Sequence, residues 1–542
     1  MKETTRPARH VPVLIVGGGP VGLALAAELG WRGVVCELVE QGDGTISTPK
    51  MNEVNTRTME FCRRWGIADA VRNCPFPADH SLDVVFVTSL GGHELARMRR
   101  PTRAQQKADS FSPERLQICS QLWFDPVLQT FARAQPTVTL RYRTRLETFE
   151  QTDGGVTVEL HDLESGQHET VRAQYLVGCD GANSAVRDAL GIALQGPGTL
   201  GHPVHLYFRA PDLLAQCGRE PGVFFLAIDR HGLWANIRVI DPANGLWRLM
   251  VLDTDGKQTP DSIDRDALLQ RAVGRPIDVE WKGLSIWTRK SVVAERYAKG
   301  RVFLAGDAVH QLSPTGALGM NTGIGDAVDL GWKLAAVLQG WGGANLLASY
   351  DSERRPIGLR NVRMATEFHL AHGAFAGDMA AIEDASEAGE ALRRRAGGGL
   401  TETVGRMFRT AGLQLGYCYE ASPICIADNA SPTPDDPERF MPSADAGSRA
   451  PHVWLRDGRS ILDLFGRGFV LLNFGGARTA ELEKAAAARG TPLTVAMLDE
   501  PEAVALYARR LVLVRPDGHV AWRGDTLPAD SDAMLDHVRG AI

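Results

Sequence analysis

Short apolar runs alternate with amphipathic stretches along this chain, a pattern that predicts an α/β protein. Residues 11–16 form a β-branched apolar run that ends in glycines, which is typical of a buried strand. Residues 21–31 follow as a helix of small and apolar side chains, and residues 34–39 as a second strand. We therefore expect a strand–helix–strand unit of about 30 residues at the start of a parallel sheet.

The pattern changes twice beyond this unit. Single helices and strands are expected at residues 56–65, 121–132, 138–142, 156–160 and 175–178. Between about residues 200 and 285, strand-like pieces separated by turn residues predict a mainly antiparallel sheet inserted into the α/β scaffold. These pieces are residues 205–209, 222–229, 233–240 and 247–252. A buried strand at 301–305 and a long helix at 321–339 return the chain to the first pattern.

The C-terminal third begins with a stretch rich in Ala, Arg and Glu at residues 357–417, which predicts helices broken by glycines. Residues 426–450 are rich in Asp, Pro and Ser and are interpreted as a linker. From about residue 451 the chain restarts as a small α/β unit, with strands expected at 469–474, 493–498 and 511–514. The 542 residues therefore indicate about three domains.

A glycine-rich turn joins the first strand to the first helix. Residues 17–22 read GGGPVG, the G-x-G-x-x-G pattern of dinucleotide-binding proteins. Gly17 permits a tight turn, Gly19 lets the backbone approach a pyrophosphate, and Gly22 lets the helix pack closely on the sheet. The N-terminus of that helix presents free N–H groups to the phosphates. Glu40 ends the second strand, where its carboxylate can accept hydrogen bonds from a ribose.

Two further motifs lie where predicted strands run into loops. Residues 179–187 (CDGANSAVR) contain Asp180 and an arginine at a helix start, and alone they are equally compatible with a structural turn. Residues 306–310 (GDAVH) place Asp307 directly after a buried strand, where a carboxylate can hold a hydroxylated ligand. The glycines of residues 314–321 (PTGALGMN) expose backbone N–H groups at the start of the long helix, where they can stabilise a developing anion.

This ordered set of motifs resembles the class A flavoprotein monooxygenases, the aromatic hydroxylases similar to para-hydroxybenzoate hydroxylase and phenol hydroxylase. The resemblance covers roughly residues 11–360, including WKL at 332–334 and ERRP at 353–356. It implies a Rossmann-like FAD-binding domain with an inserted substrate sheet. The expected domains are FAD-binding parts at 1–190 and 286–360, a substrate domain at 191–285 with a part near 80–115, a helical segment and linker at 361–440, and a C-terminal domain at 441–542.

The site residues expected from this resemblance are carried over motif by motif. Those expected to contact FAD are Gly17, Gly19, Gly22, Glu40, Lys50, Gln121, Asp180, Asp307, Gly319, Met320 and Asn321. Gln121 would lie near the ribityl chain, and Asp307 on the ribityl or pyrophosphate side. Residues 319–321 would direct backbone N–H groups at the flavin N1/O2 edge, and Pro314 and Gly316 would line the reaction face.

One position departs from the family pattern. Lys50 stands where the family often has an arginine after a proline, here Pro49. A lysine can still meet a phosphate, although it cannot bind one bidentately.

The C-terminal segment resembles the extension of the phenol hydroxylase-like branch, which is thioredoxin-like in fold. The matching residues are 447–452 (GSRAPH) and 464–466 (LFG). No cysteine follows Cys425, so this domain lacks a C-x-x-C pair and a redox role for it is excluded. We expect it to serve packing or a subunit contact.

The resemblance implies an enzyme that uses NADH or NADPH and O2 to hydroxylate a phenolic aromatic substrate through a flavin C4a-hydroperoxide. The cofactor carries the chemistry, while the protein excludes water and orients the substrate. Other flavin oxygenations stay open, namely epoxidation, Baeyer–Villiger insertion and antibiotic inactivation. A non-catalytic flavin-binding protein is the remote alternative. The motifs determine neither the substrate, the position of hydroxylation, the preferred nicotinamide nor a general base.

The inserted sheet offers candidate substrate contacts. Alternation along its strands places side chains in three sets that each share a face: Phe224, Leu226 and Ile228; Phe225, Ala227 and Asp229; and Trp234, Asn236 and Arg238. One of these sets should look toward the flavin, and the sequence does not say which. His205, His231 and His310 are candidate bases, but structural roles are favoured for all three, and His310 is expected to fix its own loop.

Charge and composition narrow the partners and the compartment. A net charge of −6 without a long basic run argues against nucleic acid as a partner, and the densest basic stretch, at 97–103, is interpreted as a solvated loop. The apolar run at 11–29 mimics a secretory signal, but its glycines and proline favour the nucleotide-binding turn. No other run of about 18 apolar residues occurs, so no membrane span is expected.

The cysteines complete this picture. The eight cysteines are scattered, without C-x-x-C or zinc spacing, which predicts a reducing, cytoplasmic compartment and no metal site. A homodimer is usual in the family that the chain resembles.

Overall fold

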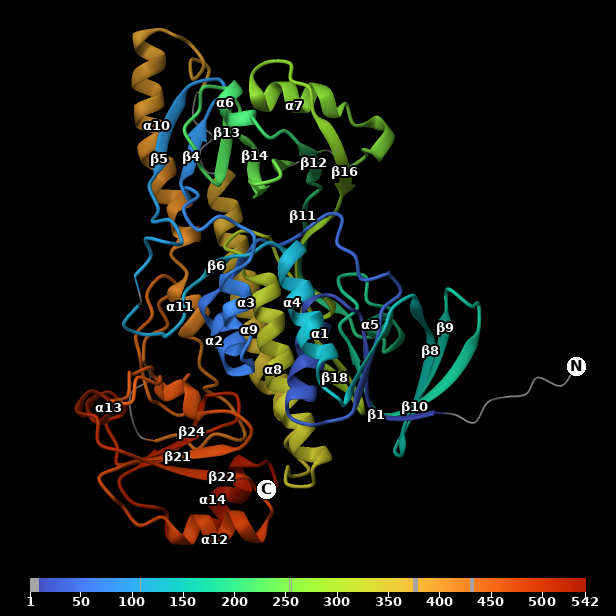
Figure 1. Ribbon diagram of the computed structural model, residues 1–542, viewed down its shortest axis with the longest axis vertical. Coiled ribbons are helices and arrows are strands. Elements are labelled where there is room, and N and C mark those ends of the chain that lie inside the picture. The colour runs from blue at the N-terminus through green and yellow to red at the C-terminus, as the bar shows by residue number, and fades with distance from the viewer. Residues whose placement is uncertain (1–8, 108, 253, 255, 374–378, 429–432) are drawn as a thin grey trace, which may run out of the picture.

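The computed structural model describes residues 9–107, 109–252, 254, 256–373, 379–428 and 433–542. Parts of the expected helical stretch at 357–417 and of the expected linker at 426–450 lie outside these residues. Figure 1 shows three regions along the long axis: the substrate sheet with α10 at one end, the sheet around β1 with α1 and α8 in the middle, and the C-terminal domain at the other end. No helix of the described residues is long and apolar enough to cross a membrane.

The central sheet is parallel where the sequence predicts it. β1 (Arg9–Val16) pairs in parallel with β2 (Cys36–Val39) and with β10 (His168–Gly178). On the outer sides, β2 pairs with β7 (Val138–Arg141) and β10 with β19 (Val302–Leu304), again in parallel. All four residues of β2 are buried, because helices cover the sheet. This confirms the Rossmann-like α/β arrangement.

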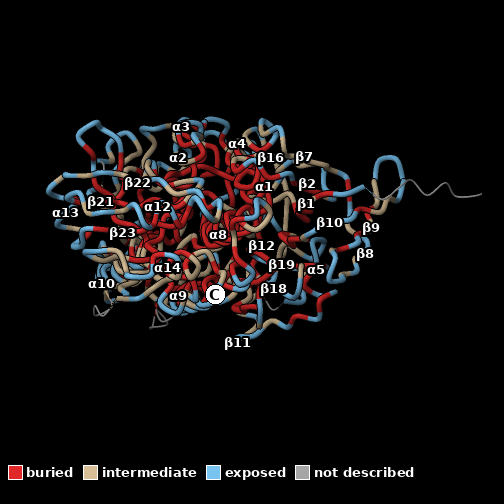
Figure 2. The backbone as a smooth tube through the Cα atoms, turned by 90° about the horizontal axis from the view of Figure 1, so that it is seen from below, coloured by how far each residue is buried: buried red, intermediate tan, exposed pale blue. Residues whose placement is uncertain are grey.

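Two long helices cover this sheet. α1 (Pro20–Trp31) follows the glycine-rich turn, and α8 (Gly319–Leu338) packs against it. α4 (Gln121–Arg133) packs on the other side of α1, and α2 (Thr56–Trp65) lies nearby. Most of α1 and α8 is buried, and both lie in the buried interior seen in Figure 2. Because β1, β10 and β19 are parallel neighbours, the three predicted motifs that follow them lie at one end of the sheet.

Several strands are longer than the sequence indicates or were not foreseen. β10 begins at His168 because its first half pairs antiparallel with β9 (Gly155–Asp162), which in turn pairs with β8 (Thr144–Thr152). A small separate sheet joins β11 (Leu194–Gly201), β17 (Arg289–Ala294) and β20 (His310–Gln311). The last of these lies between the motif residues 306–309 and 314–321.

The substrate sheet is mainly antiparallel, as predicted. Its strands follow the order β16 (Glu280–Ile286), β12 (Val204–Arg209), β15 (Leu246–Val251), β14 (Gly232–Asp241), β13 (Phe224–Asp229), β4 (Val84–Val87) and β5 (Glu94–Met98). Only the β13–β4 pair is parallel among the described strands of this sheet. α10 (Glu387–Gly405) lies so close to β5 that a Cβ at Gly397 would be 2.2 Å from Leu95 O.

The C-terminal domain has a four-stranded mixed sheet, which supports the thioredoxin-like expectation. The strand order is β22 (Leu493–Leu498), β21 (Phe469–Phe474), β23 (Leu511–Val514) and β24 (Val520–Gly524). The helices α12 (Ala480–Ala488), α13 (Pro501–Tyr507) and α14 (Ser531–Val538) belong to the same domain. Phe469 meets Trp332 of α8 edge to face, so the domain shares an apolar core with the central region.

Candidate cofactor and substrate site

The turn between β1 and α1 has a backbone geometry that only glycine adopts easily. Gly17 has a φ of +109°, and a Cβ there would lie 2.3 Å from Cys179 O. A Cβ at Gly22 would lie 2.0 Å from Gly17 O, so the helix starts in direct contact with the turn. At Gly19, by contrast, no described atom lies within 4 Å of a built Cβ. This open side of the turn is where a pyrophosphate can approach the backbone.

Glu40 is fixed beside this turn. Its carboxylate oxygens accept hydrogen bonds from Gly18 N at 2.7 Å and from Gly42 N at 2.7 Å. The first helical bond of α1 runs from Leu23 N to Gly19 O, so the N–H groups of Val21 and Gly22 precede the ladder. A carboxylate for a ribose and helix N–H groups for a phosphate therefore lie together, as FAD requires.

The side chain of Gln121 holds the next loop instead of pointing freely into the site. Its Oε1 accepts a hydrogen bond from Lys50 N at 2.9 Å, and its Nε2 donates to Asp125 Oδ2 at 2.9 Å. Its backbone N donates to Met51 O at 3.0 Å. Gln121 thus fixes the loop that carries the exposed Lys50, whose ammonium partly opposes the raised pKa of Asp307.

Asp125 is buried beneath Gln121, and burial raises its pKa to about 7. Its Oδ1 has no hydrogen-bond partner among the described residues. Because the folded protein then binds a proton that the unfolded chain releases near pH 4, stability should fall as pH rises from about 4 to about 7. We expect Asp125→Asn to raise the unfolding free energy at pH 8 by roughly 1–3 kcal/mol and to leave it unchanged at pH 4, as measured by urea unfolding. Equal effects at both pH values would contradict this assignment.

Asp307 and Asp180 differ in the surroundings of their carboxylates. The Asp307 side chain is exposed, although its neighbours Gly306 and Ala308 are buried. Desolvation by the surrounding protein raises the pKa of Asp307, and the nearby His310 and Lys50 oppose this rise. It can therefore meet a hydroxylated ligand.

Asp180 is engaged within its own motif. Its carboxylate accepts hydrogen bonds from Ser184 Oγ at 2.5 Å and from Val186 N at 3.1 Å, at the start of α5 (Ala185–Ala189). Arg187 donates to Ala182 O at 3.1 Å and to Ala308 O at 3.2 Å. The second motif therefore braces the loop of the third.

His310 holds the same loop from the other side, which confirms its expected role. Its Nε2 lies 2.8 Å from Asp326 Oδ2, and both side chains are fully buried. Asp326 also accepts hydrogen bonds from Gly306 N at 3.1 Å and from Arg354 Nε at 2.8 Å. A pocket base would need access to substrate, which this buried ring lacks.

The segment at 314–321 ends in an anchored helix start. Gly316 has a φ of +86° and Ala317 a φ of +54°, both left-handed, and α8 begins two residues later at Gly319. Asn321 Oδ1 accepts hydrogen bonds from Asn55 N at 3.0 Å and Thr58 Oγ1 at 2.8 Å. This side chain fixes the start of α8, whose first backbone N–H groups have no partner within the helix.

Comparison with known proteins agrees with this arrangement. The family model described as FAD binding domain matches residues 10–365, and the one described as aromatic-ring hydroxylase, C-terminal, matches residues 443–541. The chain belongs to the FAD-dependent aromatic-ring hydroxylases. It is therefore an FAD-dependent monooxygenase, which confirms the family, the cofactor and the enzymatic class expected from the motifs.

Named relatives of this monooxygenase match over nearly its whole length. The FAD-dependent monooxygenase apdD of Emericella nidulans is 34% identical and covers 96% of this chain and 88% of its own. The 4-methyl-5-nitrocatechol 5-monooxygenase of a Burkholderia species is 33% identical and covers 99% and 98%. A structure of RebC, soaked with chromopyrrolic acid and holding 7-carboxy-K252c, is 41% identical, with a TM-score of 0.92 and coverage of 99% and 100%.

In this monooxygenase one face of the substrate sheet contacts the loop at residues 49–53, called the cofactor loop from here on. Tyr207 OH on β12 donates to Pro49 O at 2.9 Å, and Arg238 on β14 donates to Glu53 Oε1 at 2.7 Å. Cross-strand register places Tyr207, Arg248, Arg238 and Phe224 side by side across four strands. The sequence left the choice of face open, and these contacts select the sets that contain Phe224 and Arg238.

Arg248 is a residue of this face that the sequence reading missed. It is buried, and burial lowers the pKa of its guanidinium although the neighbouring Tyr207 opposes this. No carboxylate of the described residues forms an ion pair with it, and its Nε has no hydrogen-bond partner there. An arginine inside the otherwise apolar strand LWRLMV was the signal that could have found it.

The other two candidate histidines have local roles. His205 is buried, and its Nε2 accepts a hydrogen bond from Trp287 Nε1 at 3.0 Å. Burial and nearby cations hold its pKa well below the usual value, so the ring is neutral at pH 7. His231 is exposed on the turn after β13, where its backbone N donates to Asp229 Oδ1 at 2.8 Å.

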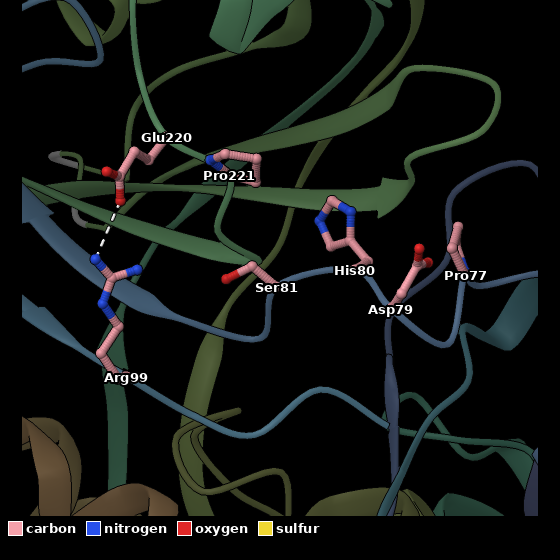
Figure 3. A pocket seen from close by; sticks show the side chains of 7 residues that line it. All are labelled: Pro77, Asp79, His80, Ser81, Arg99, Glu220 and Pro221. Atoms are coloured by element: carbon pink, nitrogen blue, oxygen red, sulfur yellow. Dashed lines mark hydrogen bonds and ion pairs between the residues drawn. The ribbon is translucent and has the colours of Figure 1, made fainter. Parts of the chain in front are cut away.

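The basic stretch at 97–103 is only partly the solvated loop that the sequence predicts, because Arg99 is 70% exposed whereas the side chain of Arg97, in β5, is buried. The Arg97 side chain is 6% exposed and pairs with Glu94 and Asp83. Arg99 pairs with Glu220 at the rim of a pocket of about 420 Å³ outside the substrate face, shown in Figure 3. The apolar stem of an arginine can pack on the protein while its guanidinium pairs with a buried acid. A count of charges along the sequence does not predict such pairing.

Proposed function

We propose that this FAD-dependent monooxygenase hydroxylates an extended phenolic aromatic that carries a carboxylate. The observation that carries the proposal is Arg248, a buried guanidinium on the cofactor-facing side of the substrate sheet without an acid partner among the described residues. A buried charge without a partner is unfavourable, so an anionic ligand group is the natural counterion.

Two further features support an extended acid as the substrate. Tyr207 and Arg238 flank Arg248, but Arg238 already pairs with Glu53 and Tyr207 with Pro49 O, which leaves Arg248 as the cation available to a ligand. RebC, one of the solved relatives, was soaked with a compound named as an acid and holds one named as a carboxy derivative. The nitrocatechol monooxygenase represents the phenolic side of the family.

The geometry of the turn, of Glu40 and of α8 supports a set of cofactor contacts in the proposed enzyme. Gly19 and the start of α1 would hold the pyrophosphate, Glu40 the ribose, and Asp307 the ribityl side. The N–H groups of residues 319–321 would face the flavin ring. When bound, FAD carries electrons from NAD(P)H to O2 and delivers one oxygen atom to the aromatic ring. The chain itself positions the substrate and excludes water.

The test compares substrate pairs that differ only in charge. Phenolic polycyclic carboxylic acids and their methyl esters are mixed with the holoenzyme, and NADH- and NADPH-dependent flavin reduction and product mass with ¹⁸O₂ are measured. The acid should be preferred by wild type. In Arg248→Met its KM should rise about 30-fold while that of the ester changes little, because a charge-assisted hydrogen bond is lost.

Two controls separate this role from general damage. Arg248→Lys keeps the charge and should retain most of the preference for the acid, and the exposed Arg209→Met should leave KM unchanged. If wild type has the same KM for acids and their esters, the carboxylate proposal is wrong. Incorporation of one ¹⁸O atom into the product tests hydroxylation separately. Release of peroxide alone for every compound would instead favour a different oxygenation.

The assembly and the compartment belong to the same proposal. The partners of this enzyme are an aromatic substrate, O2 and a reduced nicotinamide. We propose a homodimer in the cytoplasm, in keeping with the eight free cysteines of the chain. Light scattering of the purified holoenzyme tests the dimer.

A further inference from the structure

Two cysteines that lie far apart in the sequence meet beside the cofactor loop. Cys74 follows α3 (Ala68–Arg72) on the way to β4, and Cys119 follows β6 (Gln117–Ile118) just before α4. Both are buried free thiols, with exposed fractions of 8% and 0%. Cys74 Sγ donates to the carbonyl oxygen of Ile118 at 3.4 Å, and Ile118 directly precedes Cys119, so the two cysteines are neighbours in space.

A guanidinium lies next to this pair. Arg103 Nη1 is 3.6 Å from Cys74 Sγ, and the same side chain is held by the carbonyl of Phe76 at 2.5 Å and by that of Arg72. No carboxylate of the described residues forms an ion pair with Arg103, so the thiol is the neighbouring group that can become an anion. The Cys119 hydrogen bond and Arg103 lower the pKa of Cys74 to about 6, although burial opposes them.

Two other buried thiols, Cys36 in β2 and Cys62 in α2, have the opposite character. Cys36 and Cys62 are buried in apolar surroundings, and burial raises the pKa of each. The pKa of Cys119 is raised as well, by the neighbouring Cys74 and by burial. The pair therefore combines one thiolate, which attacks, with one thiol, which can resolve the product.

We propose that Cys74 and Cys119 form a peroxide-oxidisable pair that closes to an intramolecular disulfide. The Cys74 thiolate attacks one oxygen of H2O2, the O–O bond breaks, and the hydroxide released takes up a proton as water. The sulfur of the resulting sulfenic acid is then attacked by Cys119, the S–O bond breaks, and a second water leaves. Two thiols and one peroxide thus give one disulfide and two waters, with both electrons per peroxide accounted for.

The disulfide would join two segments that serve different parts of the site. Cys119 N donates to Asn52 O at 3.0 Å, so Cys119, directly after β6, is held to the loop that carries Lys50. Cys74 belongs to the connection that enters the substrate sheet at β4. A monooxygenase releases H2O2 when reduced flavin reacts with O2 without oxygenating a substrate, and this link to uncoupled turnover rests on the proposed function. The disulfide would form in response to this peroxide and would tie the segment between α3 and β4 to the cofactor loop.

The experiment supplies the peroxide directly, so its outcome does not depend on the proposed substrate. The holoenzyme is treated with a small excess of H2O2, free thiols are blocked with iodoacetamide in denaturant, and peptides are mapped without reduction. We expect one cross-linked peptide pair, Cys74 to Cys119, while Cys36 and Cys62 stay fully alkylated. The rate of cross-linking should fall as pH is lowered through about 6, because the thiolate is lost.

Variants divide the two roles within the pair. Cys119→Ser should leave a Cys74 sulfenic acid that dimedone traps, and Cys74→Ser should give neither adduct nor cross-link. Arg103→Gln should slow cross-linking at pH 7 by roughly fivefold, with FAD content as the check that the variant is folded. Full alkylation of both cysteines in peroxide-treated wild type, or a cross-link that forms only after unfolding, would overturn the proposal.

Discussion

Gly22→Ala is expected to yield a protein that no longer retains FAD on purification. The added Cβ would lie 2.0 Å from Gly17 O and 3.3 Å from Cys179 Cβ, so α1 must move away from the turn that it packs against. Such a shift displaces the N–H groups at the helix start from the phosphate position. We expect FAD affinity to fall by more than about 100-fold and unfolding free energy to fall by roughly 3 kcal/mol or more. Flavin absorbance per protein and urea unfolding measure the two effects.

Two other glycines provide matched comparisons. Gly19→Ala meets no described atom within 4 Å, so it should weaken FAD binding while leaving the stability of the FAD-free protein unchanged. Gly398→Ala lies on the exposed face of α10 with the same open surroundings, and it should leave FAD binding intact and raise stability by up to about 1 kcal/mol. If Gly22→Ala keeps its flavin as well as Gly398→Ala does, the close helix–turn contact does not determine binding.

Arg515→Met is expected to detach the C-terminal domain from the central region. Arg515 lies between β23 and β24, and its guanidinium bonds Glu353 Oε2 at 2.9 Å, Asp329 Oδ1 at 3.1 Å and Asp517 Oδ2 at 2.7 Å. Lys333 joins the same buried network through Asp329 at 2.7 Å. Removing the guanidinium leaves buried carboxylates without their main partner, which should lower the unfolding free energy by about 3–5 kcal/mol.

The network also predicts a dependence on pH. Arg515 and Lys333 hold the pKa of Glu353 at about 2, below its ordinary value of 4.5, although burial opposes them. A depressed carboxyl pKa contributes stability that is present above pH 4.5 and is lost as pH falls toward 2. We expect this loss in wild type and a much smaller one in Arg515→Met, measured by thermal unfolding across that range. Limited proteolysis should release the C-terminal domain from the variant only.

An exposed arginine of the same domain serves as the control. Arg510→Met removes a single contact to Gly475 O and should change stability by less than about 0.5 kcal/mol. A double variant, Arg515→Met with Glu353→Gln, should recover part of the lost stability because one unpaired charge is removed. Equal stabilities of Arg515→Met and Arg510→Met would show that the network does not hold the domains together.

The roles of Lys333 and Glu353 show how far motif reasoning reaches. Both belong to matched family motifs, and the sequence correctly placed Lys333 on the long helix α8. In this fold Glu353 accepts a hydrogen bond from Arg515, a residue 162 positions further along the chain. Lys333 joins the same network by donating to Glu353 and Asp329. No periodicity predicts such a pairing, because it depends on where a separate domain docks.

The sequence by itself determined the local elements and the cofactor class. Gly17, Gly19 and Gly22 follow from the chemistry of a tight turn, and the period of apolar residues set the strand β1 and the helix α1. These signals are local, since backbone conformation and amphipathicity depend on a few neighbouring residues. The chain could therefore be recognised as a flavoprotein with an inserted sheet before its structure was known.

Only the tertiary structure decided which groups meet. The contacts of Tyr207 and Arg238 identify the face of the substrate sheet that lies against the cofactor loop. Arg248 lacks an acid partner among the described residues, and Cys74 lies next to Cys119. Within the stretch at 97–103, which the sequence predicts to be a solvated loop, Arg97 and Arg99 form ion pairs with acidic side chains. The physical reason is that charge compensation, burial and thiol contact are properties of residues distant in sequence, and cross-strand register and domain docking determine them.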